Sequence, residues 1–267
     1  MLADRMNIFI FTKQDEDSLS KKEIVIEAMQ HEGFKVVEQS EDANIIISIG
    51  NDGTFLQAVR KTNFRQDCLY AGIYSEGRQA MYCDFHYNNL HEMVLAIRKA
   101  DIEVRRYPLI EASIDNQQTF YCLNEFSIRS NIIRTFVVDV IIDDKLFETF
   151  LGDGLIISTP TGSTAYNKSV RGAVVDPFLP CFQVTELASV NNNTYRTLGS
   201  PFILSGDRKL RLHVHQDGND FPSVAMDNEA IGVRRVVDVE IGLSDKVIKT
   251  VKLKHNSFWE KVQRIYL

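Results

Sequence analysis

The hydrophobic pattern of this 267-residue chain changes its period once, near residue 101, and this change constrains the possible folds more than any other feature. Before it, short apolar runs typical of buried strands alternate with segments of helical period, and the runs lie at 8–11, 34–37, 45–49 and 69–73. Strands and helices that alternate across short connections are typical of a parallel sheet. We therefore predict a Rossmann-like parallel α/β domain over residues 1–101.

Two segments of this first half carry helix signals. Ser20 and Glu23 match a capping box, which predicts a helix over 20–32 that stops at Gly33. Its inner side is predicted to hold Ile24 and Ala28, extended by Val25 and Met29. A second helix is expected over 89–100, where apolar residues recur on one face.

After residue 101 helical periodicity nearly disappears, and short strands joined by tight turns take over. The strands are expected at 136–142, 146–150, 210–214, 237–241 and 247–253, with turns at Asp143-Asp144 and at 217–219. Such a pattern predicts an antiparallel β sandwich or barrel. The fold class is therefore α/β + all-β, with a C-terminal β-rich sandwich domain over residues 102–267 that ends in a short helix near 257–262.

Composition excludes several classes of protein. No apolar run approaches the ~18 residues of a membrane span, and acidic Asp4 precedes no long apolar stretch, so no secretory signal is expected. The net charge of −6 argues against a nucleic-acid partner, because phosphate neutralisation needs clustered Lys and Arg. The four cysteines form no C-x-x-C pair and are expected to be free thiols of a reducing cytoplasm: Cys68, Cys83, Cys122 and Cys181.

The first candidate for chemistry is Gly50-Asn51-Asp52-Gly53-Thr54, directly after the apolar run 45–49 and before a helix. Ligands bind at this end of parallel strands, and N–H groups at a helix start hold phosphate oxygens. A carboxylate beside phosphate is a poor binding group, but it suits a base that takes a proton from an attacking hydroxyl. The alternative is a plain strand–helix turn with Asp52 as the N-cap.

The second candidate is Leu123-Asn124-Glu125, which lies between two strand-like segments. Neighbouring residues of a regular strand point to opposite faces, so both polar side chains can meet one ligand only at a strand end or a bulge. Exposed strand residues are the simpler interpretation.

The third candidate is the segment 152–167, which is dense in Gly, Ser and Thr and contains Asp153 and Tyr166. Its strand 155–157 leads into hydroxyl and amide groups that suit a ribose and a diphosphate, and Tyr166 could stack on a base. The alternative is a surface loop. Residues 162–169 nearly match a phosphate-binding P-loop, but Asn167 replaces its second glycine. His213 and His215 share a strand face without a third ligand, so no metal site is predicted.

Taken together, the three motifs resemble those of the bacterial-type NAD kinases, in order and in spacing, over nearly the whole chain. The first motif is shared with lipid kinases and 6-phosphofructokinases, whereas the third is far more specific. Residues 184–189 and 193–196 also resemble later segments of this family. The overall character is similar to that of the second NAD kinase found in many Firmicutes.

The resemblance implies phosphorylation of the 2′-hydroxyl of the adenosine ribose of NAD to give NADP, with ATP and Mg²⁺, or polyphosphate, as the donor, by a cytoplasmic homotetramer. It makes Asp52 the catalytic base. The binding residues that it implies are Gly53 and Thr54 for phosphate, Asn124 and Glu125 for adenosine, Thr161, Thr164 and Ala165 for adenine, and Asp153, Tyr166, Ser169 and Ala188 near the nicotinamide riboside.

Three positions depart from the family pattern. Asn51 stands where relatives usually have Gly; it tolerates a left-handed conformation, but its side chain could crowd a phosphate. Leu151 replaces a basic residue that could meet the product's 2′-phosphate. The loop 75–82 replaces a loop that is more apolar elsewhere in the family. Within it, Tyr82 is expected to cover the adenosine and Arg78 to supply positive charge.

Two other functions stay open at this point. A lipid kinase would share the Asp52 loop, but the sequence shows no basic amphipathic helix that marks a membrane surface. A dinucleotide-binding regulator without catalysis would fit the departures at Asn51 and Leu151.

Overall fold

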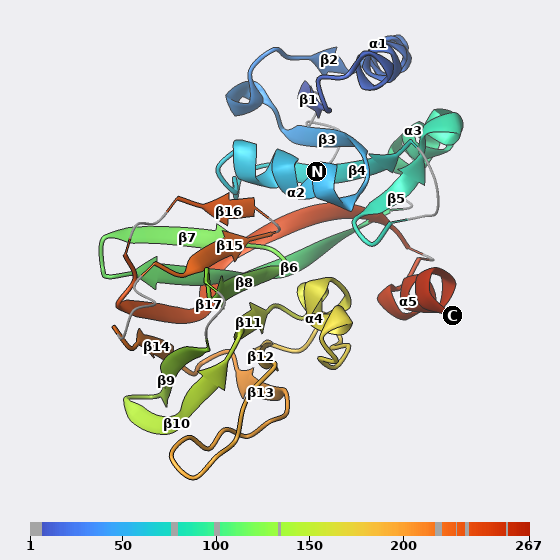
Figure 1. Ribbon diagram of the computed structural model, residues 1–267. Coiled ribbons are helices and arrows are strands. Elements are labelled where there is room, and N and C mark those ends of the chain that lie inside the picture. The colour runs from blue at the N-terminus through green and yellow to red at the C-terminus, as the bar shows by residue number, and fades with distance from the viewer. Residues whose placement is uncertain are drawn as a thin grey trace. The chain divides into compact units, whose positions relative to one another are not determined.

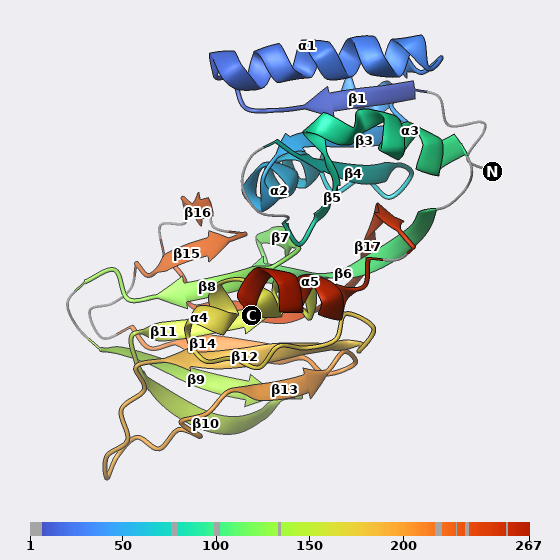
Figure 2. The ribbon, with the colours of Figure 1, turned by 90° about the vertical axis from the view of Figure 1, so that its right-hand side faces the viewer.

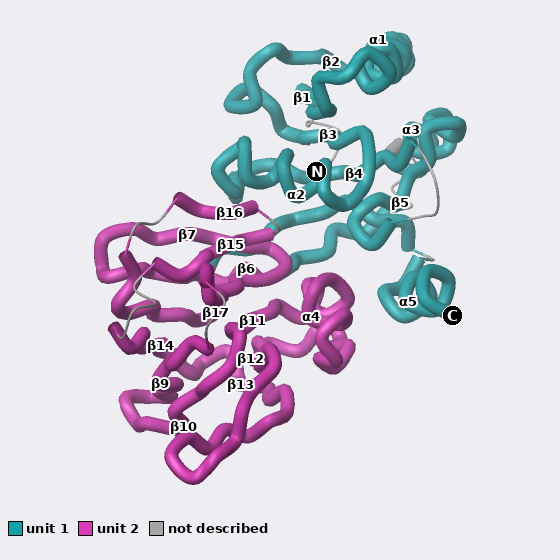
Figure 3. The backbone as a smooth tube through the Cα atoms, in the orientation of Figure 1, with its two compact units in different colours: residues 1–107, 246–267 teal, residues 108–245 magenta. Residues whose placement is uncertain are grey.

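The computed structural model describes residues 7–75, 80–98, 102–132, 135–216, 221–227, 229–232, 235–254 and 256–267. The chain divides into two compact units (Figure 3): unit 1 contains Met1–Tyr107 and Lys246–Leu267, and unit 2 contains Pro108–Asp245. We expected a single boundary at residue 101 and a second domain that runs to the C-terminus. The division instead falls after Tyr107, and the last segment of the chain returns to unit 1.

Unit 1 is built on the predicted parallel sheet, in the order β4-β3-β1-β2 with β5 beside β4. The strands are β1 (Asn7–Phe11), β2 (Lys35–Val36), β3 (Ile45–Gly50), β4 (Leu69–Tyr74) and β5 (Cys83–His86). All neighbouring pairs among them are parallel. Every residue of β3 except the terminal Gly50 is buried, as its continuous apolar run predicts for a strand covered on both faces.

Helices cover both faces of this sheet (Figure 1). They are α1 (Glu16–His31), α2 (Asp52–Lys61) and α3 (Leu90–Arg98), with the short 3₁₀ turns η1 (Ser40–Asp42) and η2 (Tyr87–Asn89). α1 and α3 share a core with Ile45, Ile47 and Ile49 of β3. α2 packs on the other face, where Phe55 meets the ring of Tyr70 edge-on at 6.1 Å.

The predicted start of α1 is wrong. The Asp15 carboxylate accepts a hydrogen bond from the backbone N–H of Ser18 at 2.9 Å and caps the helix one turn before Ser20. The earlier start leaves Ser20 inside the helix. Val25 and Met29 form its buried face, whereas Ile24 is half exposed. Gly33 does end the helix region, with a φ of 84°.

Unit 2 is the predicted antiparallel sandwich (Figure 2). One sheet has the order β13-β12-β11-β8-β15-β16, and the facing strands include β10-β9-β14-β17 and the β6–β7 hairpin. Their bounds are β6 (Ile102–Ile114), β7 (Gln118–Cys122), β8 (Glu125–Arg129), β9 (Phe136–Ile142), β10 (Lys145–Gly152), β11 (Gly154–Ser158), β12 (Cys181–Leu187), β13 (Phe202–Ser205), β14 (Leu210–Val214), β15 (Ser223–Met226), β16 (Glu229–Ile231) and β17 (Asp238–Leu253). Apolar side chains of both sheets form one buried core, which includes Phe126, Phe136 and Phe182.

β17 is one strand where the sequence predicts two. Residues 242–246 stay extended, so Asp238–Leu253 runs without a break. Leu210 pairs with Ile241 near its start, and Tyr70 pairs with Thr250 near its end. The strand therefore belongs to unit 2 in its first half and to unit 1 in its second, and local pattern alone does not show that continuity.

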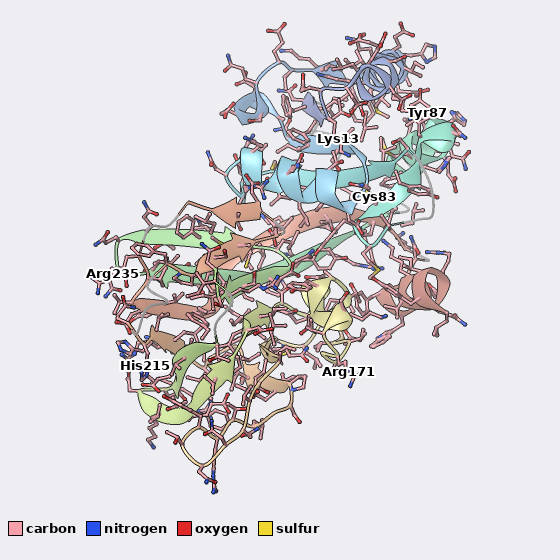
Figure 4. All side chains as sticks on the ribbon, viewed as in Figure 1. Lys13, Cys83, Tyr87, Arg171, His215 and Arg235 are labelled. Carbon is pink, nitrogen blue, oxygen red and sulfur yellow. The ribbon has the colours of Figure 1, made fainter. Side chains whose placement is uncertain are left out.

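The C-terminal helix and the cysteines agree with the predictions. The C-terminal helix is present as α5 (Phe258–Tyr266), which begins at a capping box of Ser257 and Glu260. All four cysteines are free and buried, including Cys83 on β5 (Figure 4). The expected turn at 217–219 lies outside the described residues. Among the helices described, none has the length and apolar character needed to cross a membrane.

Candidate active site

The turn between β3 and α2 is shaped by Gly50 and Asn51. Gly50 has a φ of 146°, and a Cβ there would lie 2.4 Å from the Thr54 hydroxyl oxygen, so only glycine fits. The Asn51 side chain accepts a hydrogen bond from the Thr54 N–H at 3.1 Å and caps α2. Asn51 is therefore the N-cap rather than Asp52. Its φ of −107° is extended, so the turn does not need a left-handed residue at this position.

Asp52 is the first residue of α2, and its carboxylate is fixed by two backbone donors. The N–H of Met81 donates to Oδ2 at 2.9 Å, and the N–H of Tyr82 donates to Oδ1 at 2.8 Å. Burial raises the pKa of Asp52 above its usual value, although these two N–H groups and the charges of Lys252 and Lys261 oppose the rise. A carboxylate that is held in place and binds protons more tightly than usual is suited to act as a base.

Tyr82 is placed differently from our expectation. Its ring stacks on Phe55 with the centroids 5.0 Å apart and meets Tyr107 edge-on, and only 3% of its surface is exposed. The side chain therefore packs in unit 1 and does not present an open face to an adenosine. Arg78 lies outside the described residues.

In unit 2, Asn124 and Glu125 are buried, which rules out the interpretation as exposed strand residues. The Asp227 carboxylate accepts hydrogen bonds from the backbone N–H groups of Leu123 and Asn124, at 2.9 and 2.6 Å. Thr159 completes the arrangement, because its N–H donates to the Asn124 carbonyl and its hydroxyl donates to the Leu123 carbonyl. The Asn124 backbone is thus held from two sides.

Asp227 was missed by sequence reasoning. It follows β15 at a φ of 47°, more than a hundred residues beyond the Asn124 motif. The only local signal is the sequence pair Asp-Asn, a combination that is common in turns of every function. Its contact with residues 123 and 124 depends on strand pairing between β15 and β8.

Glu125 is a buried carboxyl group with an unusual proton affinity. Burial, together with the nearby charge of Asp227, raises its pKa to about 8, against a smaller opposing effect of the Tyr166 N–H. Its Oε2 is buried and meets no hydrogen-bond partner among the described residues. Buried polar atoms are nearly always paired, so this oxygen is a candidate to bind a ligand hydroxyl.

The segment after β11 folds as η3 (Thr161–Thr164) and α4 (Tyr166–Ser169) and is mostly buried, unlike a surface loop. Gly162 approaches the Asn124 backbone so closely that a Cβ there would lie 2.0 Å from the Asn124 carbonyl oxygen. Asn167 has a structural role, because it accepts a hydrogen bond from Thr185 at 2.6 Å. The glycine lets η3 pack against the Asn124 motif.

The predicted binding residues of unit 2 fall into two groups. Asn124, Glu125, Thr161, Thr164, Ala165 and Tyr166 lie around the start of β8 and the end of β11. Asp153 and Ala188 lie at the opposite end of β11, where the Asp153 N–H donates to the Leu187 carbonyl. The strand between them spans about 13 Å, at ~3.3 Å per residue. Ser169, at the end of α4, is exposed.

Leu151 and the histidine pair have structural contacts. Leu151 is buried on β10, and its carbonyl accepts a hydrogen bond from the Val190 N–H at 2.7 Å. Each imidazole of the histidine pair lies 3.0 Å from a carboxylate oxygen, His213 from Asp238 and His215 from Asp139. These contacts favour paired surface side chains over ligands of a metal.

Comparisons with known proteins found similar sequences and similar folds. A family model described as the ATP-NAD kinase C-terminal domain matches residues 123–253. NAD kinase 2 of Bacillus subtilis is 62% identical over the full length of both chains, and NAD kinase 2 of Oceanobacillus iheyensis is 53% identical over 266 residues.

Two solved structures share the fold at low sequence identity. Yeast NADH kinase complexed with NADH has a TM-score of 0.82 at 16% identity, covering 97% of this chain and 87% of its own. The NAD kinase from Archaeoglobus fulgidus in complex with ATP has a TM-score of 0.75 at 23% identity, covering 97% of each chain. They confirm an N-terminal α/β domain followed by a β-rich domain.

Proposed function

Because the chain belongs to the NAD kinase family, we propose that it phosphorylates NAD to NADP with ATP as the donor, on the 2′-hydroxyl of the adenosine ribose. Full-length identity above 50% to several NAD kinases supports the reaction. The observation in the structure that carries it is the Asp52 carboxylate, which two backbone N–H groups hold at the start of α2.

Unit 1 supplies the base in this proposal. Asp52 takes the proton of the ribose hydroxyl as the oxygen attacks the terminal phosphorus of ATP; the bond from that phosphorus to the bridging oxygen breaks, and ADP leaves. The N–H groups of Met81 and Tyr82 prevent the carboxylate from rotating away, so that its position is set before the substrate binds. Thr54 is fully buried and bonded to Asn51, so we assign the phosphate contact of this turn to the exposed Gly53 and a supporting role to Thr54.

Unit 2 binds the dinucleotide in this proposal. Asn124 and the unpaired oxygen of Glu125 hold the adenosine ribose, and Thr161, Thr164 and Ala165 line the adenine pocket. Tyr166 and Ser169 are assigned to the nicotinamide riboside. Asp153 and Ala188 lie at the opposite end of β11, too far away to contact that same riboside within one chain. Tyr82 is not part of the assignment, because its ring is packed against Phe55.

The residues that the structure describes do not form a cage for Mg²⁺. Both oxygens of the Asp52 carboxylate accept backbone hydrogen bonds, and the described residues include no group of three or more His, Cys, Asp or Glu side chains suited to a metal. Mg²⁺ is commonly bound through substrate phosphates and waters. We therefore expect the ion to arrive with ATP, where it neutralises charge on the phosphates.

We also propose that the chain forms a homotetramer in the cytoplasm. Unit 2 exposes several large apolar side chains, which are Leu146, Phe147, Phe178, Leu179, Leu198 and Ile203. Phe147 of β10 and Phe202 of β13 lie with their rings 5.2 Å apart, so part of this apolar surface is contiguous. Exposed apolar patches often mark protein interfaces. Light scattering after size-exclusion chromatography tests the proposal, and a monomeric mass contradicts it.

The reaction is tested with the purified protein, NAD, ATP and Mg²⁺, and a coupled dehydrogenase that accepts only NADP. NADP formation supports the proposal. If ATP gives no product, polyphosphate is the next donor to test. Failure with both donors, while NAD still binds in calorimetry, leaves the dinucleotide-binding regulator. Phosphorylation of diacylglycerol or a sphingoid base in vesicles, without NADP formation, would establish the lipid kinase instead.

A further inference from the structure

A buried group of charges in unit 1 has no role in the reaction as described so far. Asp84 of β5, Lys252 of β17 and Lys261 of α5 all have side chains that are 0–2% exposed. The Asp84 carboxylate pairs with both ammonium groups and also accepts a hydrogen bond from the Leu253 N–H at 3.0 Å. Charged groups are almost never fully buried unless they are paired, so this cluster needs an explanation.

The two lysines contact the same stretch of backbone that holds Asp52. Lys252 donates to the Tyr82 carbonyl at 2.6 Å, and Lys261 donates to the Met81 carbonyl at 2.9 Å. The N–H groups of these two residues donate to the Asp52 carboxylate. The 81–82 backbone is therefore fixed on one side by the lysines, and its N–H groups fix Asp52 on the other.

The charges of the cluster do not balance without Asp52. Two ammonium groups meet one carboxylate, and a purely structural buried ion pair needs only one cation for Asp84. Both lysine charges also act on Asp52 and favour its ionised form. With Asp52 included and both lysines protonated, two carboxylates face two ammonium groups, and the charges balance.

The two lysines differ in proton affinity. Burial and the charge of Lys252 lower the pKa of Lys261 to about 7, despite its contact with Asp84. The charge of Asp84 raises the pKa of Lys252, although burial opposes the rise. The other titratable groups that face them are Cys83 of β5 and Tyr107 of β6. Lys261 is therefore charged at mildly acidic pH and loses its charge above neutrality.

We propose that Lys252 and Lys261 are positioning residues for the proton-accepting Asp52: they anchor the Met81–Tyr82 backbone and stabilise the ionised carboxylate. This inference rests on the proposed kinase function. It gives the C-terminal helix α5 a role in positioning the base of unit 1. The last turns of the chain thus contribute to the acid–base chemistry through Lys261, which touches no substrate.

The test compares Lys261→Met with Arg264→Met, a variant that removes one positive charge from the same helix at an exposed position. Lys261→Met leaves Asp84 paired with Lys252, so the buried Asp84 carboxylate keeps a cation and the protein is expected to fold. The rate of NADP formation is measured as kcat/KM from pH 5 to 9. In parallel, ¹³C NMR follows the side-chain carboxyl carbon of Asp52, assigned with Asp52→Asn.

Loss of the Lys261 charge should move the acid limb of the profile, and the Asp52 titration, to higher pH by about one unit. That shift is about a tenfold loss of rate on the acid side, and the two proteins should converge above pH 8, where Lys261 is neutral in the wild type. Arg264→Met should leave both curves unchanged.

A loss of rate that is uniform over the pH range, or an Asp52 titration that does not move, overturns the inference. If Lys261→Met does not fold, Lys252→Met is measured instead. Its Asp52 titration should also move to higher pH, but the shift does not depend on neutralisation of the lysine above pH 8, because the pKa of Lys252 is raised. A wild-type protein that makes no NADP refutes the proposed function instead, and the NMR titration then still decides whether the lysines control Asp52.

Discussion

Gly162 offers a sharp test of how unit 2 positions its binding residues. A methyl group at this position would lie 2.0 Å from the carbonyl oxygen of Asn124, 2.4 Å from its carbonyl carbon and 2.5 Å from its Cα. All three atoms belong to the backbone, which cannot rotate away as a flexible side chain could. Gly162→Ala must therefore push η3 and the Asn124 segment apart.

The size of the effect follows from that distance. To restore an ordinary contact of about 3.4 Å, the two segments must separate by ~1.4 Å, and displacements of this order can cost about 10²-fold in a reaction that depends on alignment. The overpacked interior should also lose about 1–3 kcal/mol of stability. Asn124 cannot follow freely, because its N–H is bonded to Asp227 and its carbonyl to Thr159.

The assay measures NAD binding by calorimetry, NADP formation and thermal unfolding for Gly162→Ala. Gly232→Ala is the matched control in the same unit, because a Cβ at residue 232 meets no atom of the described residues within 4 Å. We expect weaker binding, slower turnover and a lower Tm for Gly162→Ala only. Wild-type NAD affinity in a folded Gly162→Ala protein would refute the claim that η3 positions Asn124.

Two further predictions concern the turn at Asn51 and the buried carboxyl of Glu125. Asn51→Ala removes the cap of α2 and should cost about 0.5–2 kcal/mol, whereas Asn51→Ser should keep most of it; equal Tm values for the two variants would contradict the capping role. Glu125 has its pKa raised from 4.5 to about 8, so its contribution to stability is full below pH 4.5 and is lost as the pH rises towards 8. The Glu125→Gln side chain cannot ionise, so the Tm of this variant should approach or exceed that of the wild type between pH 6 and 9. If the Tm difference between variant and wild type does not change with pH, Glu125 is not a buried, protonated carboxyl group.

Much of the fold could be predicted because the sequence alternates so regularly. The apolar runs of unit 1 became parallel strands, and Asp143 and Asp144 formed a hairpin turn with positive φ at both residues. The start of α1 was missed because two plausible N-cap residues, Asp15 and Ser20, lie about a turn apart. Asp15 is the residue that caps the helix. Which of two local signals prevails depends on the contacts of the whole helix.

Long-range pairing explains what the sequence could not show. The return of residues 246–267 to unit 1 follows from one strand pairing at Thr250 and from the burial of Lys252 and Lys261, and no local pattern encodes either. A lysine is ordinarily assigned to the surface. Asp227 was missed for the same reason, since its partners at Leu123 and Asn124 are distant in sequence.

The sequence predicts which residues belong to the candidate site better than it predicts how their side chains are placed. Asp52, Asn124 and Glu125 were recognised from motifs, and each is held by hydrogen bonds or burial that suit a functional group. The packing of Tyr82 against Phe55 was not foreseen, because an aromatic residue in a polar loop suggests a ligand contact. Only the structure shows which aromatic rings the Tyr82 side chain contacts.

The central claim is that Asp52 acts as the base in phosphorylation of NAD, and Asp52→Asn tests it most directly. Rates of NADP formation and NAD affinities of the variant and the wild type are measured side by side. Asn offers one acceptor oxygen instead of two, so the N–H of Met81 or Tyr82 loses its partner and folding must be checked by Tm. We predict a fall in turnover of about 10²-fold or more with NAD binding largely retained; near-normal turnover in the folded variant would contradict the account.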